Sequence, residues 1–427
     1  MALDPEEIKR KRQLRQQQRE KQKKIKRILL ILIPVLILLA VGALLFFLLR
    51  PGSTPPATTP ADPSGSAALS DPSDPQAEVE DDPNKTVVRL VAAGDLNVKD
   101  AVIASGGTTY DYTDTFIDVA PILADGDITL LNFEGNLCGT PYGTETASAP
   151  QELMTALSNI GVDMIQLANS YSINHGISGL RNTIDGVKAA GMEPLGVYAD
   201  ENEYRLGKGY TIKEVNGIKI AFIAFTKGMD GMTLPPGSEH CVNVLYSDYD
   251  STYQSVNTSA ITSVLDAAAS AKPDFTVVLL HWGSEYNDNI SASQKRILNL
   301  LKNRGVDCIL GTHSHYVQKM EFNKEAGTFI AYSLGDFCSD GVRSGTEYSV
   351  ILELEITKDL ETEETKVTGY NFTPIYMVTE GDEPLRVVQI APAMAAFNSA
   401  YIDPVSQLSY DEMVYALDRI KARIQGS

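Results

Sequence analysis

Seven short apolar runs, each closed by polar residues, follow one another after Thr86 and constrain the fold more than any other feature. The runs are TVVRLVAAGD, DITLLNFEGN, DMIQLANS, IKIAFIAFT, DFTVVLLHWG, DCILGTHSH and TFIAYSLGDF. Apolar runs of this length, bounded by polar residues, are typical of buried strands. Segments with helical periodicity lie between several of the runs, so the sequence predicts an α/β domain.

Four segments between these runs carry the helical pattern: APQELMTALSNIG, GLRNTIDGVKAAG, NTSAITSVLDAAASA and SASQKRILNLLKNRG. In the last of them, Ser291 or Ser293 can cap the start and Gly305 can end the helix. Two later runs, YSVILELEIT and TKVTGYNFTPIYMV, are expected to form longer antiparallel strands. A final helix is expected over SYDEMVYALDRIKARI.

An uncharged apolar segment extends from Ile28 to Leu49. At about 1.5 Å per helical residue, a segment of this length spans the roughly 30 Å core of a bilayer. A cleaved signal peptide is the alternative, but its apolar region would be shorter and followed by small residues. We therefore predict a single-pass membrane anchor. The basic residues before it predict a cytoplasmic N-terminus and an extracellular main domain.

Charge is unevenly distributed along the 427 residues. Residues 1–50 carry twelve Lys or Arg against four Asp or Glu, and the whole chain carries −19, so residues 51–427 carry −27. Such an acidic domain would repel phosphates, which argues against a nucleic-acid partner. Hydrophobic residues make up 43% of the chain, enough for a substantial core.

Composition divides the chain into five parts. They are a basic cytoplasmic segment (1–27), the transmembrane anchor (28–49), a Pro/Ser/Thr/Asp-rich linker (50–85), the α/β domain (86–395) and a helical tail (396–427). The linker lacks the apolar residues for a core and is expected to act as an extended spacer. The four cysteines show no CxxC spacing, and we predict no disulfide bond between them.

Chemistry is expected at the carboxyl ends of the predicted strands, where open α/β sheets bind ligands. Only one of the five histidines, His240, lies away from these ends. The candidate strand-end residues are Asp95, Asn132, Glu134, Asn169, His281, Glu285, His313, His315 and Asp336. Imidazole and carboxylate ligands suit Mn, Fe or Zn, and a carboxylate can bridge two ions.

The sequence therefore predicts a divalent metal site with one or two ions, and a buried polar network without metal is the alternative. The predicted metal ligands are Asp95, Glu134, Asn169, His281, His313 and His315, and the predicted catalytic residues are His281, His313 and Glu285. The side chains of His313 and His315 would point the same way only if the backbone between them were extended. Trp282, the single Trp, fits a site wall or core packing equally well.

Six of these blocks together resemble a known family. AAGDLN, NFEGNL, LANSYSINHG, HWGSEY, LGTHSHYVQ and YSLGDF occur in the order found in CapA-type poly-γ-glutamate (capsule) synthesis proteins. That family is similar in fold to calcineurin-like metallophosphoesterases. The resemblance covers about residues 86–340 and implies a sandwich of two central sheets flanked by helices, with a metal centre at its top.

One block departs from the family pattern at the expected catalytic loop. The family usually reads Ala-Asn-Asn-His, with an Asp three residues on, whereas this chain has Ser170 and Tyr171 at the second Asn and the His, and Asn174 at the Asp. The resemblance thus places Ser where an amide ligand is expected and Tyr where a catalytic His is expected. Tyr, with a pKa of about 10, is a poor general acid near neutral pH. His175 could take the role if the loop were helical.

Three functions follow from these observations. The first, implied by the resemblance, is a membrane-anchored accessory in synthesis, export or attachment of an anionic polymer such as polyglutamate, with membrane synthases as partners. The second is an active metal-dependent phosphoesterase or polymer hydrolase. The third is a non-catalytic binding relative, which Ser170 and Tyr171 favour.

Overall fold

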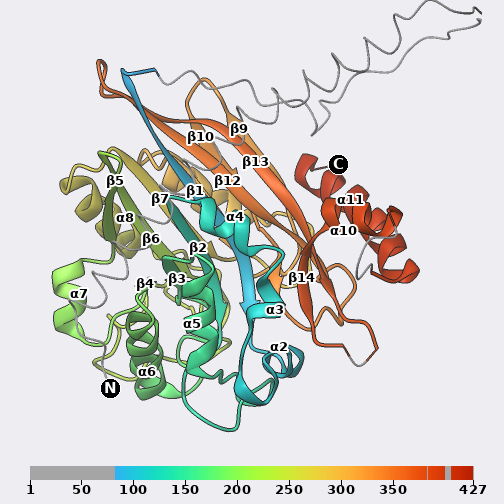
Figure 1. Cartoon of the computed structure of the whole chain (residues 1–427). Coiled ribbons are helices and arrows are strands. Elements are labelled where there is room, and N and C mark those ends of the chain that lie inside the picture. The colour runs from blue at the N-terminus through green and yellow to red at the C-terminus, as the bar shows by residue number, and fades with distance from the viewer. Residues whose placement is uncertain (1–81, 382, 400–404, 427) are drawn as a thin grey trace, which may run out of the picture. The chain divides into compact units, whose positions relative to one another are not determined.

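Two mixed β-sheets form the centre of the part of the chain that the structure describes (Figure 1). The computed structural model describes residues 82–381, 383–399 and 405–426. The predicted cytoplasmic segment, the anchor at 28–49 and nearly all of the linker lie outside these residues. Within them, no helix has both the length and the apolar character needed to cross a membrane.

The first sheet has the strand order β14-β13-β12-β1-β2-β3-β4, with β11 also paired to β1. Strands β1 to β4 are parallel, whereas β12, β13 and β14 are antiparallel. The antiparallel prediction for the two long runs is thus confirmed. The bounds are β1 Lys85–Asn97, β2 Ile128–Glu134, β3 Met164–Gln166, β4 Glu193–Leu195, β11 Asp336–Cys338, β12 Tyr348–Asp359, β13 Thr365–Val378 and β14 Arg386–Gln389.

The second sheet has the order β5-β6-β7-β8-β10-β9. Its four inner strands are parallel, and the edge strands β5 and β9 run antiparallel to their neighbours. The bounds are β5 Thr211–Val215, β6 Ile218–Thr226, β7 Phe275–His281, β8 Cys308–Thr312, β9 Met320–Asn323 and β10 Thr328–Ala331. Six of the seven predicted runs form one strand each, and the prediction of an α/β fold is confirmed. The seventh run, TFIAYSLGDF, was predicted as one strand ending at Asp336, but it is divided between β10 in the second sheet and β11 in the first, so Asp336 begins a strand.

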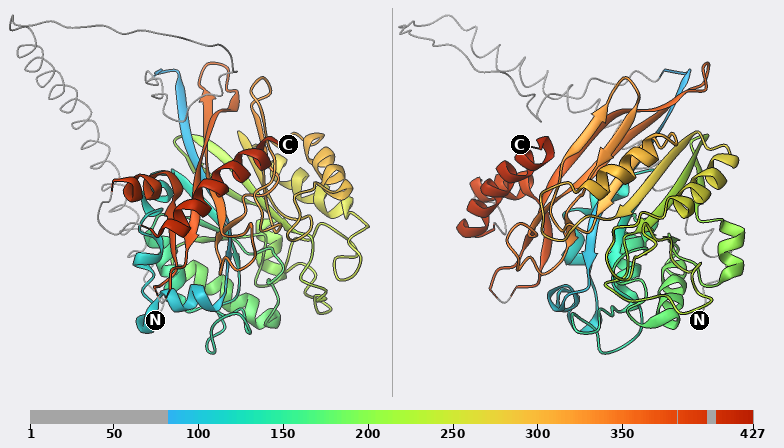
Figure 2. Two further views of the ribbon diagram at one scale, coloured as in Figure 1. Left: turned by 90° about the vertical axis from the view of Figure 1, so that its right-hand side faces the viewer. Right: turned by 180° about the vertical axis from the view of Figure 1, so that it is seen from behind.

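The four predicted interior helices correspond to α5, α6, α8 and α9. Of the two candidate caps for α9, Ser291 is the one used, and its hydroxyl accepts from the backbone N–H of Gln294. The tail helix α11 packs with α10 against β13 (Figure 2). The bounds are α2 Asp100–Ser105, α3 Thr113–Phe116, α4 Ala120–Asp125, α5 Gln151–Asn159, α6 Gly176–Ala189, α7 Glu201–Gly207, α8 Thr258–Ser270, α9 Ala292–Lys302, α10 Ile390–Asn398 and α11 Gln407–Gln425.

Strand β6 shows how the second sheet separates two apolar layers. Ile220 and Phe222 belong to the main core, whereas Ile223 and Phe225 belong to a second cluster together with residues of α8 and α9. Alternate side chains of a strand point to opposite faces, so both faces of β6 must be apolar. Trp282 lies in the second cluster and donates to the carbonyl of Tyr332 at 3.0 Å, which makes it a core residue.

Gly94 brings two carboxylates together. A Cβ atom at this position would lie 1.8 Å from the carbonyl oxygen of Gly335, so only glycine permits the close approach of β1 to the segment that begins β11. The next residue, Asp95, donates its backbone N–H to that carbonyl at 2.9 Å. Asp95 and Asp336 are therefore direct neighbours in the parallel pair of β1 and β11.

Candidate metal centre

The strand ends bring six buried His, Asp and Glu side chains into two adjacent groups of potential metal ligands. Within each group, the ligand atoms all lie within 4.8 Å of one another. The glutamate group consists of Glu134, His281 and His313, and the aspartate group consists of Asp95, His315 and Asp336. Five of the six were predicted as ligands from the sequence. Asp336 was noted as a strand-end residue but was not among the predicted ligands.

The glutamate group joins the ends of strands from both sheets. Glu134 ends β2 in the first sheet, whereas His281 ends β7 in the second sheet and His313 follows β8. The Oε1 atom of Glu134 lies 3.4 Å from Nδ1 of His281, and the two imidazole centroids are 4.4 Å apart. All three side chains are at least 97% buried, so the group is assembled only when the two sheets meet.

The aspartate group is tighter. The Nδ1 atom of His315 lies 2.8 Å from Oδ1 of Asp336 and 3.8 Å from Oδ2 of Asp95. Asn97, which was not predicted, donates its amide N–H to the same Oδ1 of Asp336 at 3.1 Å. Asn97 lies two residues after Asp95 on β1, and this period of two could have identified it from the sequence.

Asn132 links the two groups. Its amide nitrogen donates to Asp95 at 2.7 Å and to Glu134 at 3.3 Å, and its oxygen accepts from the Asn169 amide at 3.0 Å. The oxygen of Asn169 accepts the backbone N–H of Tyr171 at 2.9 Å. Asn169, predicted as a ligand, is thus engaged with Asn132 and with its own loop, and in this arrangement it orients Asn132.

The loop that carries both histidines is not extended. His313 and His315 have φ values of 87° and 60°, in a region that residues other than glycine rarely adopt. The carboxylate of Asp95 holds the first turn by accepting the backbone N–H of His313 at 3.0 Å. This conformation sends His313 to the glutamate group and His315 to the aspartate group.

Burial sets the protonation of the centre. It lowers the pKa of His281 and of His313 well below the usual value, so both imidazoles are neutral and can offer lone pairs. Burial raises the pKa of Asp95 to about 7 and raises that of Glu134 well above its usual value. Burial also opposes the charged form of His315, but Asp336 raises its pKa to about 11.

The donor set fits divalent metal ions. The carboxylate of Glu134 is 2% exposed, and its contacts with Asn132 and His281 are long for hydrogen bonds to a charged group, at 3.3 and 3.4 Å. A buried carboxylate with such weak partners is costly unless a cation compensates it. Oxygen and imidazole donors are those that Mn, Fe and Zn accept.

The loop after β3 lies against this centre. The hydroxyl of Ser170 is 3.1 Å from Nε2 of His281. Tyr171 is partly buried, and burial together with the charge of Glu134 raises the pKa of its hydroxyl. His175 is held away, because its Nε2 lies 2.6 Å from the Thr146 carbonyl and the loop forms turns instead of a helix. The prediction that His175 could take the catalytic role expected at position 171 is therefore wrong, because it required a helical loop.

Glu285, predicted as catalytic, is exposed in the loop after β7 and belongs to neither group. Its neighbour Tyr286 is closer to the centre, since its ring stacks on His315 with centroids 5.0 Å apart. Gln318 anchors the same loop by donating to the Asn287 carbonyl at 2.7 Å. The charge of Glu285 still acts on the site, since it is one of the carboxylates that raise the pKa of Glu134 and of Tyr171, and it partly offsets the lowering of the pKa of Lys227.

Lys227 was missed by the sequence analysis. It directly follows β6, and its Nζ lies 3.2 Å from Nε2 of His313 and 3.2 Å from the carbonyl of Gly283. Burial lowers the pKa of its ammonium group. The signal is present in the sequence, because Lys227 directly follows the run IKIAFIAFT and so lies at a strand end like the other candidates.

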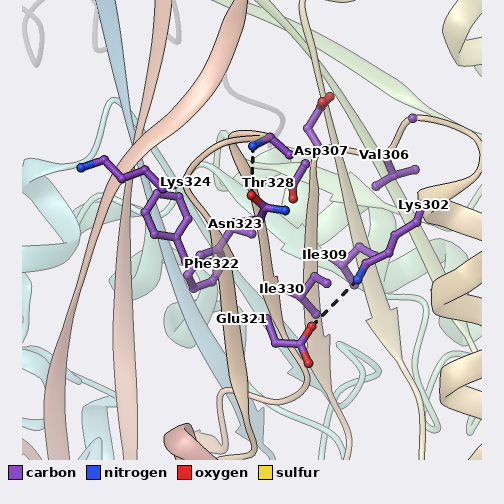
Figure 3. Close-up of a pocket in the computed structure, with 13 residues that line it drawn as sticks. Lys302, Val306, Asp307, Ile309, Glu321, Phe322, Asn323, Lys324, Thr328 and Ile330 are labelled. Atoms are coloured by element: carbon purple, nitrogen blue, oxygen red, sulfur yellow. Dashed lines mark hydrogen bonds and ion pairs between the residues drawn. The ribbon is translucent and has the colours of Figure 1, made fainter.

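A cavity of about 620 Å³ lies at the opposite ends of the strands and is separate from this centre (Figure 3). Its lining includes Asp307, which precedes β8, and Glu321 and Asn323 of the edge strand β9. It contains none of the six residues of the two groups.

Comparison with known sequences identifies related proteins. The family described as "Bacterial capsule synthesis protein PGA_cap" matches residues 89–341. The chain is 28% identical to the capsule biosynthesis protein CapA of Bacillus anthracis over 264 residues, 58% of each chain. It is 26% identical to the PGA biosynthesis protein CapA of Bacillus subtilis (strain 168) over 262 residues, 56% of this chain and 60% of that protein. The chain thus spans less than two thirds of the length of either relative.

Solved structures of phosphoesterases are similar at low sequence identity. The calcineurin-like phosphoesterase YfkN of Bacillus subtilis is 15% identical, with 79% of this chain and 97% of that chain covered and a TM-score of 0.43. A putative 5'-nucleotidase of Staphylococcus aureus is 13% identical, with 78% and 58% covered and a TM-score of 0.43.

Proposed function

Because the chain belongs to the PGA_cap family of bacterial capsule synthesis proteins, we propose that it acts on a capsule polymer of the poly-γ-glutamate type. The step would be synthesis, export or attachment of that polymer. The observation that carries the proposal is the pair of buried ligand groups where the two sheets meet. The glutamate group and the aspartate group would each hold one divalent ion, with Mn, Fe and Zn as candidates.

Bound divalent ions would polarise a carbonyl or phosphoryl oxygen and lower the pKa of a bound water. The protein's own residues prepare the site for this. His281 and His313 are neutral, and Ser170 lies in hydrogen-bonding distance of His281. Tyr171 keeps its proton because its pKa is raised, so its hydroxyl is suited to donate a hydrogen bond to a ligand.

Membrane attachment is part of the proposal. The apolar segment 28–49 would anchor the chain, and the linker 50–85 would hold the domain outside the membrane, beside the synthase that makes the polymer. Protease added to intact cells should then degrade the domain and spare an epitope tag placed before residue 28. Protection of the whole chain would contradict this orientation.

Metal analysis of the purified full chain tests the centre itself. After incubation with Mn, Fe or Zn, we expect about two tightly held ions per chain, as in two-metal sites. His313→Ala should remove at least one ion, whereas His240→Ala is the matched control and should remove none. A folded wild-type chain that takes up none of the three metals would refute the proposed centre.

An active metal-dependent hydrolase is the second candidate, supported by the same two groups, and a non-catalytic binding relative is the third, supported by Ser170 and Tyr171. Incubation of the metal-loaded chain with poly-γ-glutamate and with a phosphodiester distinguishes them. Cleavage of the diester alone would favour the phosphoesterase. Binding of the polymer without cleavage would favour the binding relative.

A further inference from the structure

A row of contacting side chains includes one histidine of each ligand group and has a cation at each end. The row is Lys227, His313, His315, Tyr286 and Arg343. At one end, Nζ of Lys227 lies 3.2 Å from Nε2 of His313, whose ring centroid is 6.3 Å from that of His315. At the other end, Tyr286 stacks on His315 at 5.0 Å, and the guanidinium of Arg343 lies 3.7 Å from the Tyr286 centroid.

The order of the row relates each cation to one ligand group. His313 belongs to the glutamate group and contacts Lys227. His315 belongs to the aspartate group and contacts Tyr286, whose ring carries Arg343. Each ligand group is therefore linked to one of the two cations through its histidine.

Both cations are available to a ligand. Within the described part of the chain, neither has a carboxylate partner at ion-pairing distance. Lys227 contacts the Gly283 carbonyl and lies 4.6 Å from the Tyr253 ring centroid. Arg343 is exposed apart from the face that lies on Tyr286. Stacking on a ring leaves the N–H edge of the guanidinium free for a carboxylate.

We infer that Lys227 and Arg343 are the recognition residues that hold a linear polyanion, with carboxylates at regular intervals, across the metal centre. This assignment rests on the proposed function and explains how an acidic domain receives an acidic polymer. Residues 51–427 carry −27, which repels a polyanion as a whole. A cation at each end of the row, with metal ions between them, reverses that repulsion locally.

Binding of a fluorescently labelled poly-γ-glutamate to the manganese-loaded full chain tests the assignment. We expect Lys227→Gln to weaken binding about tenfold, because this ammonium group is partly desolvated, and Arg343→Gln about threefold, because it is exposed. The double variant should lose about thirtyfold. The matched controls are Lys302→Gln and Arg304→Gln, which lie away from the row and should bind like the wild type.

Salt dependence separates recognition from a structural role. Affinity of the wild type should fall as sodium chloride is raised, and the double variant should show a smaller fall, because two charge contacts are gone. Affinities are compared at equal manganese occupancy, which is measured for the wild type and for each of the three variants. If the double variant kept the affinity and the salt dependence of the wild type, Lys227 and Arg343 would not be the recognition residues, and the proposed function would still stand. Failure of the wild type to bind would overturn the proposed function together with the assignment. Stronger binding of labelled polyphosphate than of poly-γ-glutamate would overturn the carboxylate polymer as the ligand.

Discussion

Acidic residues lie at both the amino ends and the carboxyl ends of the parallel strands, and they have different partners at the two ends. At the amino ends, one aspartate precedes each of four strands: Asp127 before β2, Asp163 before β3, Asp274 before β7 and Asp307 before β8. Each accepts a backbone N–H from the neighbouring strand, at 2.9, 3.0, 2.7 and 2.8 Å respectively. Each also returns its own N–H to the carbonyl of the same residue.

At the carboxyl ends, the acids meet one another and the histidines. Asp95, Glu134 and Asp336 are at most 3% exposed, whereas the four aspartates of the amino ends are all partly exposed. The comparison shows that the partner, and not the residue type, distinguishes a carboxylate that completes a sheet from one that could hold a metal ion. A carboxylate that accepts an otherwise unpaired backbone N–H completes the hydrogen bonding of a sheet. A buried carboxylate that lies beside another carboxylate is stabilised by a cation.

The largest expected effect is at Glu134. Replacing it by Gln removes a ligand charge from the glutamate group, and we expect metal affinity to fall at least about a hundredfold. The metal-free protein should become more stable, by roughly 1–3 kcal/mol, because an amide is cheaper to bury than a weakly bonded carboxylate. Metal titration and thermal unfolding of the metal-free chain measure the two effects. Reduced stability with unchanged metal binding would place Glu134 with the structural carboxylates.

The next largest effect is expected on the rate of phosphodiester hydrolysis at the carboxyl ends. Ser170→Asn combined with Tyr171→His restores the family pattern at the loop after β3. Because a positioned general acid contributes about 10²- to 10⁴-fold, phosphodiester hydrolysis should rise by at least about tenfold. The rate of the metal-loaded variant against the wild type is the measurement. An unchanged rate with metal bound would mean that the loop after β3 does not supply the general acid.

At the amino ends, a smaller effect on stability alone is expected. Asp274→Ala leaves the backbone N–H of Lys219 without its acceptor and removes the ion pair with Lys358 at 2.7 Å. The free energy of unfolding should fall by about 1–3 kcal/mol with no change in metal content. Glu325→Ala, at an exposed position, is the control for loss of a surface charge. Loss of metal in Asp274→Ala would contradict the separation of the two ends.

The smallest effect is pH-dependent and occurs at Asp307. Burial raises its pKa to about 6, above an unfolded value of about 3.9, so the folded state binds the proton more tightly. The stability that Asp307 contributes is therefore present below about pH 4 and is lost as the pH rises to 6. Asp307→Asn keeps an acceptor for Thr276 and should stabilise the protein by roughly 1 kcal/mol at pH 7–8.

The matched control for this pH dependence is Asp274→Asn, which should act in the opposite direction. Burial opposes the charge of Asp274, but hydrogen bonds from Lys358 and Lys219 lower its pKa overall. Its contribution is present above the unfolded pKa and is lost as the pH falls, so the Asn variant should be destabilised at neutral pH. Unfolding at pH 4 and pH 8 separates the two variants. If both Asn variants were destabilised at neutral pH, the hydrogen bond from Thr276 would outweigh the cost of burying the charge of Asp307, and the prediction would be wrong.

Much of the architecture could be predicted because it depends on local pattern. The seven runs became strands, and the four interior helices and the antiparallel pair appeared where periodicity indicated them. Short elements such as β4, β14 and α7 were missed, because three to seven residues carry too little periodicity and are held by their neighbours. The strand-end rule identified all six grouped residues as candidates, and five of them were predicted as metal ligands.

The sequence by itself determined the α/β class, the strand ends as the candidate site and the residue types available there, because the apolar runs and their polar ends specify what must be buried. Only the tertiary structure decided how those residues divide into the glutamate group and the aspartate group. The approach of β11 at Gly94 pairs Asp336 with Asp95, and two left-handed residues send His313 and His315 to different groups. These are contacts between segments hundreds of residues apart in some cases, and no local pattern encodes the distance between them.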